Sequence, residues 1–133
     1  MTQFDKRNLS MMMDFYEMTM SYGYFHQPNR DVRVAFDLFF RSVPDKGGYA
    51  IFAGLQHVIE FVENLSFSDA DIAYFRKQNL FSEEFLDFLR GFRFRGDIYA
   101  MPEGTIIYPN EPLLTIVAPI IDAQLVETAI LAQ

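Results

Sequence analysis

The sequence contains no cysteine, so it can form neither a disulfide bond nor a thiolate metal site. Its only two histidines, His26 and His57, lie far apart in the chain and form no metal-binding pair. It has no Walker A sequence and no nucleophile elbow. These absences argue against the self-contained active sites that a short motif can reveal. For each histidine a structural role is the preferred interpretation.

Basic residues are also scarce, because 11 Lys and Arg stand against 18 Asp and Glu, and the net charge is −7. With no basic run, a nucleic-acid partner is disfavoured, although a few placed arginines would suffice for a phosphate ligand. No segment approaches about 18 uninterrupted apolar residues, so no membrane span is predicted. The sequence shows no secretory signal, and together these features predict a cytoplasmic protein.

Apolar side chains are abundant, since 50% of the 133 residues are hydrophobic and 15 are Phe. A lone domain of this length buries only about two-thirds of the surface of its unfolded chain. We therefore expect one domain, residues 1–133, that leaves apolar surface for a missing domain, a partner subunit or both.

Helical and strand periodicities both occur along the chain, which predicts an α+β fold with several helices and a short, curled sheet. The final helix reaches Gln133 without a glycine, asparagine or proline to end it, so we expect the chain to be a fragment of a longer protein. Helices are predicted over 14–27, 47–65 and 120–133, and strands over 32–41, 97–100, 105–108 and 113–118. Two further helices are predicted to start at Ser68, which forms a capping box with Asp71, and at Ser82, which acts as an N-cap. Alternation in the first strand predicts one apolar face, made of Val32, Val34, Phe36, Leu38 and Phe40.

The segment Met11–Phe25 holds five methionines and five aromatic residues. Asp14 as N-cap and Glu17 three residues later match a capping box. Helical spacing assigns one set of side chains to the core. A second set is expected to face a partner subunit, as the family resemblance given below implies, so Tyr16 should be more exposed than Phe15 or Met18. The expected core set is Phe15, Met18, Tyr22 and Phe25, and the expected subunit-facing set is Met12, Tyr16 and Met20.

Two positions admit both a binding role and a structural one. If Asp14 caps the helix, Tyr16 lies beside free N–H groups at the positive end of the helix dipole, where it could stack on a planar ligand. Alternatively, Asp14 only caps and Tyr16 only packs. Arg41 ends a strand, where its guanidinium could bind a phosphate or form a surface ion pair with Asp37.

Four segments in order resemble the N-terminal part of nicotinate phosphoribosyltransferase, from about Leu9 to Gln133. The segments are DFYEMTMSYGYF, AFDLFFRSVPDKGGYAIFAGL, GDIYAMPEGTIIYPNEPLLTI and AQLVETAILAQ. The resemblance implies a hammerhead-like α+β domain, truncated here before the α/β barrel of the family.

The resemblance further implies that the full-length enzyme makes nicotinate mononucleotide from nicotinate and phosphoribosyl pyrophosphate, in salvage towards NAD. ATP hydrolysis is coupled through a phosphorylated histidine, with ATP and Mg as cofactors. The family forms dimers whose active sites are shared across the interface. Neither His26 nor His57 matches the phosphorylated histidine, so the 133-residue chain alone is expected to be inactive.

By resemblance, Tyr16 matches the tyrosine that stacks on the pyridine ring, Asp14 the acid just before it, and Arg41 a basic residue that reaches the phosphates across the interface. Two other hypotheses stay open. One is a related phosphoribosyltransferase that uses nicotinamide or quinolinate. The other is a free-standing, non-catalytic association module.

Overall fold

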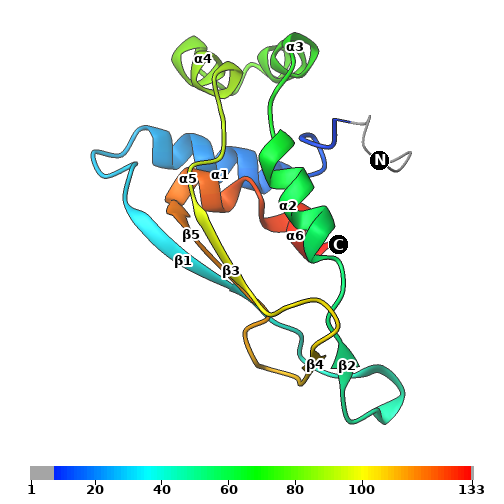
Figure 1. Ribbon diagram of the computed structural model, residues 1–133. Coiled ribbons are helices and arrows are strands. Elements are labelled where there is room, and N and C mark those ends of the chain that lie inside the picture. The colour runs from blue at the N-terminus through cyan, green and yellow to red at the C-terminus, as the bar shows by residue number, and fades with distance from the viewer. Residues whose placement is uncertain (1–7, 133) are drawn as a thin grey trace.

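The structure is a computed structural model that describes residues 8–132. A three-stranded antiparallel sheet lies at its centre (Figure 1). The central strand is β5 (Leu114–Pro119), which pairs with β1 (Arg33–Leu38) on one side and β3 (Asp97–Ala100) on the other. The register places Phe36 of β1 and Ile98 of β3 opposite Ile116.

Strand β1 shows the alternation that its sequence predicts. Val34, Phe36 and Leu38 are half-buried against the core, whereas every second residue between them is exposed. The predicted apolar face of this strand is therefore confirmed for these three residues, whereas Val32, assigned to the same face, is exposed and precedes β1.

Helices cover the upper part of this sheet. Helix α1 (Phe15–Phe25) packs on α5 (Ile120–Gln124), while α3 (Asp69–Lys77) and α4 (Glu83–Arg90) contact each other above them (Figure 1). Aromatic side chains pack between these helices: the ring centroids of Phe85 in α4 and Phe25 in α1 are 5.3 Å apart. The remaining helices are α2 (Leu55–Asn64) and α6 (Glu127–Leu131).

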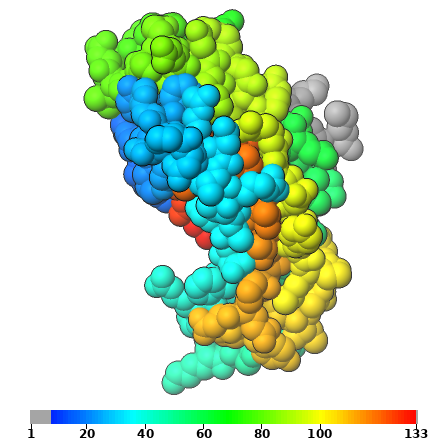
Figure 2. Space-filling view, turned by 90° about the vertical axis from the view of Figure 1, so that its left-hand side faces the viewer, coloured from blue at the N-terminus to red at the C-terminus, as the bar shows by residue number. Residues whose placement is uncertain are grey.

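A second, two-stranded sheet forms a projecting lobe at the lower end of the molecule (Figure 2). Its strands are β2 (Ala50–Ile51) and β4 (Ile106–Ile107), and a small separate core lies between Phe52, Ile107 and Leu113. The expectation of a single curled sheet is wrong in this respect, because β4 pairs with β2 and not with β3 or β5.

The second predicted helix starts later than expected. Ala50 and Ile51 lie in β2, and the helix begins only at Leu55 because Gly54 adopts a left-handed φ of 104°. A carboxylate from elsewhere in the chain caps it: Glu103 Oε1 accepts from the backbone N–H of Gly54 and of Gln56, both at 3.1 Å. The sequence near α2 does not predict this cap, because Glu103 lies 47 positions after Gln56 in the chain.

The predicted caps of the next two helices are confirmed. Ser68 and Asp71 form a complete capping box at the start of α3. The side chain of Ser82 accepts from the backbone N–H of Phe85 at the start of α4.

The capping box predicted for α1 is wrong. Asp14 occupies the N-cap position, but its side chain makes no capping hydrogen bond. Glu17 turns inward and is completely buried. Tyr16 is more exposed than Met18, at 44% against 0%, but Phe15 is as exposed as Tyr16, at 44%, because its ring only borders Phe81.

The last predicted helix divides into α5 and α6 around Leu125 and Val126, both of which are buried. The predicted end of this helix at Gln133 lies outside the described residues. Within residues 8–132, no helix combines the length and the apolar character needed to cross a bilayer.

Candidate functional site

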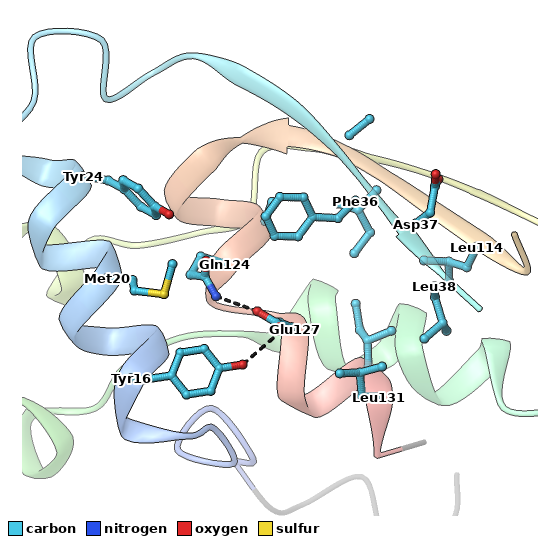
Figure 3. Close-up of a pocket in the computed structure, with 14 residues that line it drawn as sticks. Tyr16, Met20, Tyr24, Phe36, Asp37, Leu38, Leu114, Gln124, Glu127 and Leu131 are labelled. Atoms are coloured by element: carbon cyan, nitrogen blue, oxygen red, sulfur yellow. Dashed lines mark hydrogen bonds between the residues drawn. The ribbon is translucent and has the colours of Figure 1, made fainter. Parts of the chain in front are cut away.

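A groove of about 570 Å³ lies between α1, the sheet and the α5–α6 segment (Figure 3). Tyr16, Met20 and Tyr24 line it from α1, at positions one helical turn apart. Phe36 and Leu38 line it from β1. Gln124 and Glu127 line it from the α5–α6 segment, so three separate parts of the chain build one concave surface.

Tyr16 occupies a fixed place in this groove. Its hydroxyl donates to Glu127 Oε1 at 3.0 Å, and the other carboxylate oxygen of Glu127 accepts from Gln124 Nε2 at 2.6 Å (Figure 3). Desolvation raises the pKa of the Tyr16 phenol, and the hydrogen bond to Glu127 and its negative charge raise it further. The ring is therefore a neutral, half-exposed aromatic surface held by a carboxylate.

Glu17, the next residue, forms a second connection between the same two helices. Its Oε1 accepts from the backbone N–H of Thr128 at 2.7 Å and also from the Thr128 hydroxyl. Its Oε2 and the nearby Ser21 Oγ are buried, and neither has a hydrogen-bond partner within the described residues. Burial raises the pKa of Glu17, and the two bonds from Thr128 offset part of that rise.

The three binding residues predicted from the sequence do not all lie together. Asp14 and Tyr16 share the start of α1, but only Tyr16 lines the groove, and Asp14 is exposed. Arg41 lies beyond the far end of β1 and is also exposed. Among residues 8–132, Arg41 takes part in no ion pair, and Asp37 instead accepts from the Thr115 hydroxyl at 2.6 Å.

ATP and Mg are the cofactors that the resemblance implies. In the described part of the chain, no three His, Asp or Glu side chains lie close enough to hold a metal ion. His26 packs edge-on against the rings of Tyr22 and Phe25, and His57 is exposed on α2. Neither histidine therefore belongs to a metal-binding cluster within residues 8–132.

Comparison with known proteins identifies the family. The family model for the nicotinate phosphoribosyltransferase N-terminal domain matches residues 11–133. The chain belongs to this family.

Relatives from distant organisms agree with this assignment. A nicotinate phosphoribosyltransferase of Mycobacterium tuberculosis is 46% identical over 93% of this chain and 27% of its own length. The Bacillus subtilis enzyme is 40% identical over 96% of this chain and 26% of its own length. This member of the family thus spans about a quarter of the length of these relatives.

A solved structure supports the fold. The crystal structure of human nicotinic acid phosphoribosyltransferase superposes with a TM-score of 0.82 at 31% identity, over 90% of this chain and 25% of the human chain. This likeness confirms the predicted α+β fold class of the nicotinate phosphoribosyltransferase N-terminal domain.

Sequence reasoning missed the polar residues that surround Tyr16. Gln124, Glu127 and Thr128 have helical spacing within a largely apolar segment, and this pattern indicates one polar face. That signal was available from the sequence. The pairing of Glu127 with Tyr16 and of Thr128 with Glu17 could not be predicted from the sequence, because 111 positions separate the partners in each pair.

Proposed function

We propose that this chain is the N-terminal domain of an enzyme that transfers phosphoribosyl from phosphoribosyl pyrophosphate to nicotinate. The product is nicotinate mononucleotide, and the reaction serves NAD salvage with coupled ATP hydrolysis. The observation that carries the proposal is the family match over residues 11–133, together with 46% identity to a relative of that activity.

We further propose that Tyr16 stacks on the pyridine ring of nicotinate, with Asp14 beside it. The half-exposed ring of Tyr16 at the start of α1 supports this role, because an aromatic face open to solvent can accept a flat ligand. Arg41 is assigned to a phosphate group. It is exposed and forms no ion pair within residues 8–132, so its guanidinium can form a bidentate contact with a phosphate oxygen pair.

Tyr16 and Arg41 lie in different parts of the chain. Tyr16 lines the groove, whereas Arg41 follows the end of β1 at Leu38 and is not one of the residues that line the groove. We propose a homodimer in the cytoplasm, in which the active site is completed across the subunit interface, as the resemblance to the family implies.

The catalytic centre is assigned to other parts of the enzyme. We propose, as the resemblance to the family implies, that ATP and Mg bind in parts of the enzyme outside this chain, and the 133-residue chain alone should show no turnover. In this proposal the chain contributes binding surfaces for substrates and no group that reacts.

A substrate panel on the full-length enzyme tests the proposal. Nicotinate, nicotinamide and quinolinate are each supplied with phosphoribosyl pyrophosphate, with and without ATP, and mononucleotide formation is measured. Turnover is expected with nicotinate and not with nicotinamide or quinolinate. Turnover only with nicotinamide or quinolinate would refute the proposed substrate, and no turnover with any of them would favour a non-catalytic association module.

A further inference from the structure

Two adjacent residues of α1 bind two adjacent residues of α6. Tyr16 donates to Glu127, and Glu17 accepts from Thr128, both across 111 positions of sequence. The bond to Thr128 fixes the first turn of α6 against α1. Glu127 is therefore presented to Tyr16 by a helix that is itself attached to the helix carrying Tyr16.

Glu127 has little freedom of its own in this arrangement. Gln124 is only 2% exposed, so its amide is held by the core, and it donates to the second oxygen of the Glu127 carboxylate. Both oxygens of Glu127 are thus committed, one to a buried donor and one to the Tyr16 hydroxyl. Figure 3 shows this chain of contacts at the centre of the groove.

A half-exposed tyrosine does not require such an acceptor for its own stability, because water would satisfy its hydroxyl. A hydrogen bond to an ionised acceptor is about twice as strong as one between neutral groups, and it limits rotation of the ring. The rotamer entropy of the ring is then lost in folding and not on ligand binding, which increases affinity. The arrangement is that of a preorganised binding surface.

We propose that Glu127 is a positioning residue that orients the Tyr16 ring for stacking on the flat ring of the substrate. This inference rests on the proposed function, since it assumes that Tyr16 meets nicotinate. It assigns a role to Glu127 that acts through Tyr16 and involves no contact between Glu127 and the reacting atoms.

A double-mutant cycle in the full-length enzyme tests the inference. Glu127→Ala and Tyr16→Phe each remove the hydrogen bond, and each should raise the KM for nicotinate about fivefold with little change in kcat. Because both act on the same interaction, the double variant should be no worse than either single variant. Glu84→Gln, at an exposed position of α4, is the matched control and should leave KM unchanged.

Glu127→Gln separates positioning from charge. Glutamine keeps an acceptor for the Tyr16 hydroxyl, and its amide can bond with Gln124 after that amide turns over. Rescue of KM to within about twofold of wild type is therefore expected. A Glu127→Gln enzyme as impaired as Glu127→Ala would overturn the inference, because the charge would then carry the effect.

A direct measurement on Tyr16 keeps this test independent of the proposed function. Ultraviolet titration, with the Tyr16→Phe spectrum subtracted, follows the Tyr16 phenol, whose pKa should fall in Glu127→Ala. An inactive wild-type enzyme would refute the proposed function while this fall still reported the contact. An active wild type with additive effects in the cycle, or with an unchanged Tyr16 titration, would refute the positioning role.

Discussion

Glu17→Gln is predicted to stabilise the domain. Glu17 is completely buried, and its Oε2 has no hydrogen-bond partner in the described part of the chain. Glutamine has nearly the same shape, and its Oε1 can still accept both bonds from Thr128. Its amide replaces the unpaired oxygen with a donor on the side of the helix that carries Ser21, whose Oγ is also buried and unpaired.

The magnitude follows from the buried, unpaired oxygen. Leaving such a group unsatisfied costs about 1–3 kcal/mol, and more when it is charged. The amide loses some strength in its bonds from Thr128, because neutral acceptors bind less strongly than a carboxylate. The expected net gain is about 1 kcal/mol in the free energy of unfolding, or roughly 3–5 °C in Tm for a domain of this size.

The gain should depend on pH. Burial raises the pKa of Glu17 in the folded state, so the stability that it contributes is fully present below its unfolded pKa and is lost as pH rises through the folded value. Glutamine does not titrate. The advantage of the variant should therefore grow from about pH 4.5, near the usual carboxyl value, to pH 8.

Urea unfolding of the 133-residue chain, followed by circular dichroism at several pH values, measures this difference. Glu17→Ala is the contrasting variant, and it should lose about 2–3 kcal/mol because it leaves a cavity and an unpaired backbone N–H at Thr128. The reasoning is refuted if Glu17→Gln is less stable than wild type at pH 8, or if its advantage shrinks as pH rises.

Further predictions concern caps, core and substrate. Ser68→Ala should lower the free energy of unfolding by about 1 kcal/mol in urea titrations, because it removes one half of the capping box of α3. Glu103→Ala should cost about 1 kcal/mol by exposing the start of α2, whereas Glu111→Ala, at an exposed position with no such bond, should cost little. Phe85→Ala should cost about 3–5 kcal/mol, since the ring is fully buried among other aromatic rings. Arg41→Ala in the full-length enzyme should raise the KM for phosphoribosyl pyrophosphate without lowering Tm, and an unchanged KM would remove Arg41 from the site.

The sequence predicted those features that depend on near neighbours. The capping box at Ser68, the cap at Ser82 and the alternation of β1 each involve residues a few positions apart, and all three are confirmed. Strand β3 was predicted over its observed range of Asp97–Ala100. Propensity and spacing decide such features, so one segment of sequence is enough to predict them.

The predictions that were wrong concern features that depend on residues distant in the sequence. Glu17 matched a local cap, but burial against Thr128 outweighed that role. Ala50 and Ile51 lay within the helix predicted over 47–65, but both pair with β4 and form a strand. Spacing indicated the three binding residues but left a structural role open for each, the resemblance assigned their binding roles, and those roles stay predictions. The contacts of Glu127 and Gln124 that hold Tyr16 could be identified only once the fold was known.

The position of β5 in the chain has a consequence for synthesis on the ribosome. The three-stranded sheet is complete only when β5 has been synthesised, because β5 pairs with both β1 and β3. Helix α1 packs on α5, which follows β5. Translation at 5–20 residues per second separates the emergence of α1 from that of β5 by on the order of ten seconds. For that interval the methionine- and aromatic-rich helix has no sheet to cover it. A nascent chain of this kind is a natural client for chaperones that shield apolar segments.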